Sequence, residues 1–257
     1  MLQNRVIPTL LLDGGRLVKT VKFKKPIYIG DPINAVKIFN DKEVDELCLL
    51  DIKATTEGKN IDFKLLESIT REAFMPVCYG GGVKSLNAID NLFSLGIEKV
   101  ALNTMLFKNK ELIEEAVAKY GSQSIVGSVD VKKNIFGKYN FKTHAGSKNV
   151  GLDINSAMSY LNQVGVGELY LTSIDKEGTM TGFDMELISL VSNQTNLPII
   201  VNGGASNCDD IAKVFSDTSV TAVSCGSLFV YQGRHRAVLI NYPSSKIFNV
   251  LGEYKNV

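Results

Sequence analysis

The sequence carries an internal duplication in which one stretch of about 120 residues resembles the next. Sliding the chain along itself by 122 positions superimposes identical or similar residues throughout both halves. The matched pairs include Glu46 with Glu168, Leu49 with Leu171, Pro76 with Pro198, Phe93 with Phe215, and Gly81-Gly82 with Gly203-Gly204; at offset 123, Asn103-Thr104 falls on Gly226-Ser227. Two similar halves, about 1–121 and 122–245, predict a pseudo-twofold molecule. Such a molecule has two similar sites, which suit a ligand with two similar ends.

Composition and charge narrow the class of protein. A chain of 257 residues can bury a large core, and 45% hydrophobic with 21% charged residues is ordinary for a soluble globular protein. A net charge of +1 gives no electrostatic reason to expect nucleic acid or a membrane surface as partner. The first residues lack the apolar segment of a signal peptide, and the four scattered cysteines resemble reduced core thiols. We therefore expect a cytoplasmic protein.

Eight short apolar runs, rich in β-branched residues, alternate with stretches of helical spacing. The runs cover 6–12, 46–50, 77–79, 100–102, 125–129, 168–172, 199–201 and 221–225. Asp31-Pro32 has the pattern of an N-cap followed by proline in the first helical turn. Eight β-then-α units predict a parallel sheet covered by helices, and their twofold similarity favours a closed (β/α)8 barrel over an open sheet. We expect one α/β barrel domain over residues 1–257, with its last helix and a short extension after Gln232.

Turns of glycine or small polar residues follow four of the expected strands, at the barrel end where catalytic residues lie in this architecture. Glycine lets backbone N–H groups approach an anion closely, and helix N-termini favour negative charge. A single Gly pair is equally consistent with a tight turn, but its duplication favours two phosphate cradles. The predicted binding residues are Gly82, Asn103 and Thr104 in the first cradle, Gly203, Gly204, Gly226 and Ser227 in the second, and Asp51 and Gly178 beside them.

Ionisable residues at the same end are candidates for catalysis. Asp130 ends the fifth expected strand, so it can act as a general acid or base between the cradles, although it could instead cap the following turn. Glu177 lies in a loop after a strand, and Lys19 lies in a glycine-hinged loop that could close as a lid. His144 and His235 have no metal-ligand spacing with each other or with a cysteine. No metal site and no cofactor are expected.

Four charged residues mark the opposite end of the barrel. Arg5, Glu46, Lys99 and Glu168 each stand where an expected strand begins. By position alone they could form an ion-pair network that closes this end. Exposed pairs of this kind contribute only about 0–1 kcal/mol each. The functional alternative is a gated opening through the barrel axis.

Taken together, these motifs resemble the cyclase subunit family of imidazole glycerol phosphate synthase. The similarity covers essentially the whole chain and includes the segments 16–19, 45–47, 80–82, 103–104, 121–123 and 171–175. The resemblance implies that the cradles hold the two phosphates of a ribulosyl aminoimidazole carboxamide substrate, and that Asp130 is a general acid/base assisted by Lys19. It also implies that Arg5, Glu46, Lys99 and Glu168 form the gate for ammonia from a separate glutaminase subunit, which docks at this end of the barrel. This chain has no credible Cys/His glutaminase constellation of its own.

The chain departs from the family pattern on its first strand. Leu11 stands where the family has its other essential aspartate, and leucine cannot exchange a proton. Asp13 lies two residues further on and could substitute only if the strand end bends inward. Glu177 stands where the family usually has aspartate. The segments 6–8, 28–32 and 233–243 resemble a paralogous branch linked to acetamidino modification of bacterial surface sugars, where a separate sugar amidotransferase uses the ammonia.

Three hypotheses follow from these observations. The first is an ammonia-conducting barrel in sugar amidination, with altered chemistry at the mouth. The second is an authentic cyclase of histidine biosynthesis in which Asp13 replaces the missing aspartate. The third is a non-catalytic subunit that binds a phosphorylated ligand and regulates its glutaminase. The gate residues favour the first two hypotheses, and Leu11 favours the first over the second.

Overall fold

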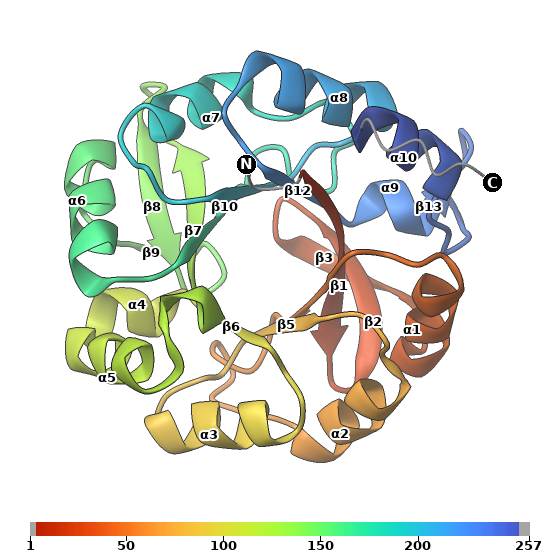
Figure 1. The fold of residues 1–257 in the computed structure, drawn as a ribbon. Helices are drawn as coiled ribbons and strands as arrows, with labels where there is room; N and C mark the ends of the chain where they lie inside the picture. The colour runs from red at the N-terminus through yellow and green to blue at the C-terminus, as the bar shows by residue number, and fades with distance from the viewer. Residues whose placement is uncertain (1–3, 252–257) are drawn as a thin grey trace.

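The computed structural model describes residues 4–251 and shows a closed barrel of eight parallel strands surrounded by helices (Figure 1). The strands follow the chain around the barrel, and β10 closes it by pairing with β7. The barrel strands are β1 (Arg5–Asp13), β4 (Leu47–Asp51), β5 (Val77–Gly80), β6 (Lys99–Leu102), β7 (Ile125–Lys133), β10 (Glu168–Ser173), β11 (Ile199–Asn202) and β12 (Ala222–Cys225). The (β/α)8 architecture expected from the sequence is confirmed.

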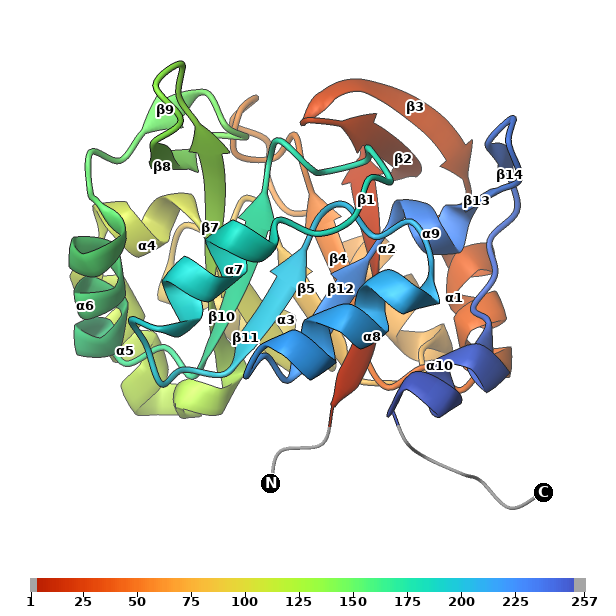
Figure 2. The same cartoon turned by 90° about the horizontal axis from the view of Figure 1, so that it is seen from above.

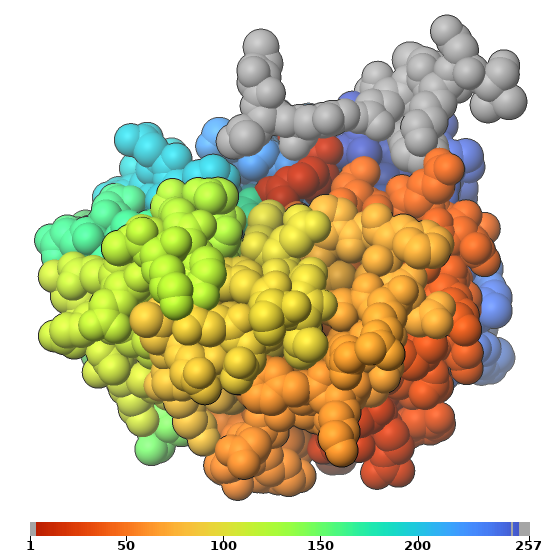
Figure 3. All heavy atoms as spheres, turned by 60° about the horizontal axis from the view of Figure 1, so that its bottom comes forward, coloured from red at the N-terminus to blue at the C-terminus, as the bar shows by residue number. Residues whose placement is uncertain are grey.

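The helices lie outside the barrel and pack on its strands. They are α1 (Pro32–Asp41), α2 (Phe63–Glu72), α3 (Leu86–Ser94), α4 (Thr104–Lys108), α5 (Lys110–Tyr120), α6 (Ile154–Val164), α7 (Met185–Ser192), α8 (Cys208–Asp217), α9 (Ser227–Val230) and α10 (Ser244–Leu251), with a 3₁₀ turn at Ser122–Ser124. The predicted start of the first helix is confirmed, because Asp31 accepts a hydrogen bond from the Asn34 N–H (3.0 Å). Figure 3 shows α2, α3 and α5 side by side on one outer face. The rings of Phe93 of α3 and Tyr120 of α5 pack there in a tilted arrangement, with their centroids 4.3 Å apart.

The internal duplication is visible in the backbone. The N-caps of α2 and α7, Asp62 and Asp184, share φ −83° and ψ 81° although they lie 122 residues apart. Asn103 and Gly226, which precede α4 and α9, have nearly the same angles, φ −108° and −106° with ψ −73° and −69°. Equivalent sequence positions therefore build equivalent turns in both halves of the barrel.

Short strands extend the carboxyl-terminal end of the barrel, where the sequence indicated only loops. They are β2 (Arg16–Val21), β3 (Lys24–Gly30), β8 (Tyr139–Thr143), β9 (Lys148–Asn149), β13 (Tyr231–Gln232) and β14 (Ala237–Val238). Figure 2 shows them on one side of the molecule. A hairpin precedes the last helix, since the chain turns at Gly233 (φ +72°) and α10 starts only at Ser244. The expected last helix after Gln232 is present, but the hairpin before it was not expected.

Two hydrophobic layers hold the barrel together. The outer layer lies between strands and helices and includes the outward-facing residues of every barrel strand. The inner layer fills the barrel itself and takes one residue from each strand: Ile7, Cys48, Cys78, Ala101, Val126, Tyr170, Ile200 and Ala222. Because side chains alternate along a strand, the next inward positions on one side of this layer reach the mouth, and those on the other side reach the opposite end.

Candidate active site at the barrel mouth

A cavity of about 620 Å³ opens at the carboxyl-terminal end of the barrel, and all eight barrel strands or the turns after them contribute to its walls. Of the residues proposed from the sequence for catalysis or binding, those that line this cavity are Lys19, Asp51, Gly82, Asn103, Thr104, Asp130, Glu177, Gly178, Gly203, Gly204, Gly226 and Ser227. The fold therefore gathers residues from almost the full length of the chain around one space. Asp13 is the exception.

The two glycine turns have equivalent geometry on opposite sides of the cavity. Gly81 and Gly203 adopt φ +114° and +101°, a region that only glycine enters without strain. A Cβ at Gly81 would lie 2.3 Å from the Asp51 carbonyl oxygen, and one at Gly203 would lie 2.9 Å from the Ser173 carbonyl oxygen. Asp51 and Ser173 are themselves equivalent under the duplication. Glycine is thus required by close backbone approach, which brings backbone groups to the cavity wall in both halves.

The second cradle combines a cation with an unsatisfied hydroxyl. The Ser227 Oγ is buried and has no hydrogen-bond partner in the structure. The Lys19 ammonium packs against Gly226, where a Cβ would lie only 2.1 Å from Nζ. Burial lowers the pKa of Lys19, although the charge of Glu177 opposes this effect. A buried donor without a partner is costly, so this corner of the cavity is suited to an anionic ligand.

The first cradle also has basic neighbours, which the sequence analysis did not single out. Lys108 Nζ lies 3.4 Å from His144 Nε2, and both residues line the cavity beside Thr104. Burial and two nearby lysines lower the pKa of His144. His144 lies on the turn between β8 and β9, and the spacing of the barrel strands in the sequence does not predict where this turn lies. Lys108 follows Thr104 by one helical turn, a signal that was present in the sequence.

Asp130 lies within β7, which continues to Lys133, and its partly buried side chain lines the cavity. Its Oδ2 accepts a hydrogen bond from Asn103 Nδ2 (3.2 Å), which also donates to two backbone carbonyl oxygens. Burial, reinforced by the charge of Glu177, raises the pKa of Asp130 to about 7. A carboxyl group with this pKa exists in both protonation states near neutral pH, as general acid–base chemistry requires. Asn103 holds this carboxyl group in place, a role beyond the phosphate contact expected from the sequence.

Above Thr9, the β1 side of the cavity is apolar. Leu11 lines the cavity and is paired in register with Leu50, which lines it too. Asp13 does not line the cavity: it ends β1 next to the Gly14–Gly15 turn and pairs with Arg16 of β2. At this point β1 has left the barrel and become part of the β2 hairpin, so its end does not bend inward. The geometry gives no support to Asp13 as a substitute for the missing aspartate.

Glu177 holds the β2–β3 hairpin over the mouth. One carboxylate oxygen accepts from Thr20 Oγ1 (2.9 Å) and the other from the Phe23 N–H (3.0 Å), while its carbonyl accepts from the Lys22 N–H (2.9 Å). Both oxygens are occupied, so the geometry favours a positioning role over the catalytic role expected from the sequence. Asp51 is similarly engaged, because its Oδ1 accepts hydrogen bonds from the backbone N–H groups of Lys53 and Ala54.

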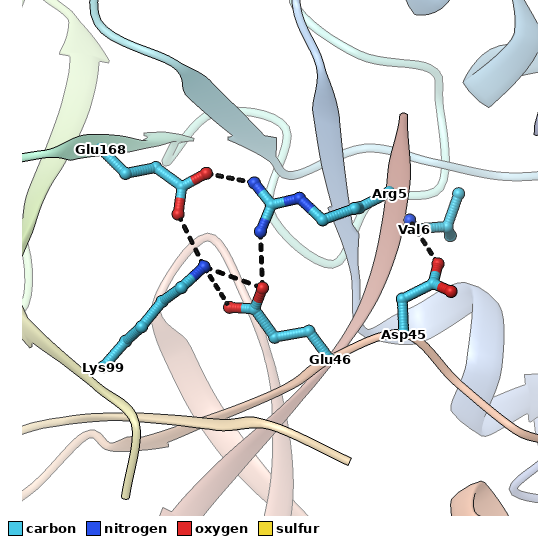
Figure 4. A network of polar contacts seen from close by, with 6 residues as sticks. All are labelled: Arg5, Val6, Asp45, Glu46, Lys99 and Glu168. Carbon is cyan, nitrogen blue, oxygen red and sulfur yellow. Dashed lines mark hydrogen bonds and ion pairs between the residues drawn. The ribbon is translucent and has the colours of Figure 1, made fainter. Parts of the chain in front are cut away.

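The four charged residues predicted at the other end form a closed ring of alternating sign, with their side chains pointing toward one another (Figure 4). Arg5 contacts Glu46 at 2.6 Å and also pairs with Glu168, and Lys99 lies 2.9 and 3.0 Å from the same two carboxylates. Burial alone would lower the pKa of Arg5 and Lys99, but the carboxylate charges outweigh it and raise both. The carboxylates are only 5% and 7% exposed. These pairs are therefore more buried than the sequence suggested.

No cluster of three metal-ligating side chains occurs within residues 4–251. Across the same range, none of the helices has the length and apolar character that a membrane span requires.

Comparison with known proteins places this geometry in a family. Residues 5–236 match the family model described as histidine biosynthesis protein. The chain belongs to this family. Two relatives named "Putative imidazole glycerol phosphate synthase subunit" are hisF2 of Pseudomonas aeruginosa, 46% identical over 95% of this chain and 97% of the relative, and hisF3 of Vibrio vulnificus, 45% identical over 95% and 94%. The imidazole glycerol phosphate synthase subunit HisF of Streptococcus mutans is 33% identical over 90% and 92%. The resemblance inferred from the sequence is confirmed.

Proposed function

We propose that this HisF-like chain is the synthase subunit of a glutamine amidotransferase. In this proposal a separate glutaminase docks at the ring of Arg5, Glu46, Lys99 and Glu168 and delivers ammonia along the barrel axis to the cavity at the mouth. The observation that carries the proposal is the arrangement of these two features at opposite ends of one barrel. Charges that served only stability would not need to surround the axis.

The cavity in this proposal binds a ligand with a phosphate at each end. Support comes from the duplicated glycine turns, from the unpaired Ser227 hydroxyl, and from Lys19 and Lys108 at the two cradles. A crystal soaked in phosphate should show anions near Gly82 and near Gly204. Empty density at both places under saturating phosphate would contradict the bisphosphate site.

The chemistry at the mouth is where this chain parts from an authentic cyclase of histidine biosynthesis. Asp130 is in place, but Leu11 and Leu50 form an apolar wall on the β1 side and Asp13 lies outside the cavity. Loss of one acid/base group typically lowers the rate about 10²–10⁴-fold. We therefore assign the ammonia to the amidination of a bacterial surface sugar, through a separate sugar amidotransferase.

The test compares ribulosyl aminoimidazole carboxamide turnover in the wild-type protein and in Leu11→Asp, with ammonium supplied directly. We expect turnover at least about 100-fold below that of an authentic cyclase, with partial recovery in the variant. Wild-type turnover equal to an authentic cyclase would instead support the histidine-pathway alternative. Gene neighbours discriminate independently, because a sugar amidotransferase gene supports amidination and histidine genes support the cyclase.

A regulatory subunit without catalysis is the remaining alternative. It predicts that phosphorylated ligands change glutamine hydrolysis while the barrel transfers no ammonia. The decisive variant is Lys99→Ala in the complex with the glutaminase. If the ring is a gate, product formation from glutamine falls while product formation from added ammonium changes less. If the ring serves only stability, the ratio of the two rates stays the same as in the wild-type complex.

A further inference from the structure

A narrow inner layer separates the charged ring from the cavity. It consists of the eight inward-facing residues that fill the barrel, and none of them carries a charge. Tyr170 is the largest of them, and it is 1% exposed. Any molecule that moves from the ring to the cavity along the axis must pass this layer.

The Tyr170 side chain reaches across the barrel. Tyr170 belongs to β10, yet its hydroxyl shares hydrogen bonds with Ser224 of β12 (2.7 Å) and with Thr9 of β1 (2.9 Å). Since β11 and β12 lie between β10 and β1, the phenol group of Tyr170 spans part of the barrel interior instead of contacting only the neighbouring strands. Thr9 and Ser224 are also hydrogen-bonded to each other.

The three hydrogen-bonded hydroxyls of Thr9, Ser224 and Tyr170, the hydroxyl triad, mark the floor of the cavity. Thr9 and Ser224 line the cavity, whereas Tyr170 does not. The cavity therefore ends at these two hydroxyls, directly above the phenol group. Tyr170 belongs to the layer between this floor and the ring of ion pairs, two residues after Glu168 on β10.

The duplication shows that Tyr170 is an asymmetric feature. Its equivalent in the first half is Cys48, and the next residue of the layer, Ile200, is equivalent to Cys78. At these two pairs of positions the first half supplies small side chains and the second half supplies large ones. Tyr170 therefore has no bulky counterpart in the first half.

We infer that Tyr170 is the group that closes the axial passage between the ring and the cavity, and that its side chain must move aside for ammonia to enter. This inference rests on the proposed function. Neutral ammonia can replace the phenol as donor and acceptor to Thr9 and Ser224. Ammonium would enter a layer that holds no carboxylate, where an unpaired buried charge is strongly unfavourable. The passage thus selects the neutral molecule.

The test uses the thiols that the fold places on either side of the strands. Cys48 and Cys78 lie in the inner layer, Cys225 is equally buried but lies in the outer layer, and Cys208 is partly exposed on α8. The purified chain is treated with methyl methanethiosulfonate, a small neutral reagent, and modification of each cysteine is followed by peptide mass spectrometry. Cys208 reports reagent activity, and Cys225 reports general loosening of the fold.

We expect Tyr170→Ala to accelerate modification of Cys48 and Cys78 at least about tenfold while Cys225 is unchanged, because local opening becomes easier only along the axis. Tyr170→Phe keeps the aromatic ring but loses the hydrogen bonds to Thr9 and Ser224, so cysteine modification should accelerate less than in Tyr170→Ala. Ile200→Ala removes volume from the same layer without touching Thr9 or Ser224 and should change these rates less than about threefold.

Two outcomes would overturn the inference. One is unchanged modification of Cys48 and Cys78 in Tyr170→Ala, and the other is an equal acceleration at Cys225. If the alanine variant does not fold, the comparison of Tyr170→Phe with Ile200→Ala decides, and equal rates in the two would reject the role of Tyr170. The assay needs neither glutaminase nor substrate. Its failure is therefore distinct from failure of the proposed function, which appears only in glutamine-dependent turnover of ring variants.

Discussion

Replacing Asp130 by asparagine should stabilise the protein at alkaline pH and leave it nearly unchanged at acidic pH. Asp130 is partly buried, and its pKa is raised from an ordinary value of 3.8 to about 7. Asparagine has nearly the same shape and keeps an oxygen that can accept the hydrogen bond from Asn103. The substitution thus removes the titration and little else.

The size of the effect follows from proton linkage. Because the folded-state pKa is raised, the folded protein binds this proton more tightly than the unfolded chain does. The stability contribution is therefore fully present below about pH 4 and is lost as pH rises to about 7. The total loss corresponds to about 4 kcal/mol, of which about 3 kcal/mol falls between pH 5 and pH 8.

Urea unfolding at pH 5 and pH 8 measures this difference. The gain in unfolding free energy from Asp130→Asn should be about 3 kcal/mol larger at pH 8 than at pH 5. Asp31→Asn serves as control, since asparagine caps a helix as well as aspartate does. The same gain at both pH values, within about 1 kcal/mol, would refute the assignment of the raised pKa to Asp130. Catalytic activity should fall in the same variant, as expected when a functional group is held at a cost in stability.

Further variants probe the ring, the cradles and the hairpin. Lys99→Met leaves two nearly buried carboxylates that share one arginine. The unfolding free energy should therefore drop by about 2–3 kcal/mol, a value between those typical of exposed and of buried ion pairs. A loss below about 0.5 kcal/mol would mean that water solvates the charged ring. Gly204→Ala places a Cβ 2.2 Å from the Gly182 carbonyl oxygen at φ +112° and should cost about 1–3 kcal/mol in thermal unfolding. Ser227→Ala removes a buried hydroxyl that has no partner, so it should raise the unfolding free energy by about 1 kcal/mol while weakening phosphate binding about fivefold by calorimetry, and unchanged affinity would place the anion elsewhere. Thr20→Val removes one hydrogen bond to Glu177, so limited proteolysis within the β2–β3 hairpin should accelerate about fivefold; an unchanged rate would show that this bond does not hold the hairpin.

The sequence was sufficient for the features that repeat along the chain. Apolar runs and helical spacing specified the barrel because each strand and helix is formed by local patterning, and parallel strands joined by helices close in few ways. The duplicated glycines specified two equivalent turns, since close backbone approach excludes any side chain at Gly81 and Gly203. The charged ring was predictable for the same reason, because residues at the starts of barrel strands must meet at one end.

Tertiary structure decided what depends on contacts between distant segments. Asp13 could replace the missing aspartate only if the end of β1 bent inward, but the pairing of β1 with β2 carries it outside the cavity. Glu177 was predicted to act on the substrate, but the hairpin occupies its carboxylate. Tyr170 was read only as part of a strand, although its hydroxyl bonds to two strands that are not neighbours of β10 in the barrel. Local patterns fix which face of a strand is buried; which groups then share that interior follows from closure of the barrel, because closure brings together residues that lie far apart in the chain.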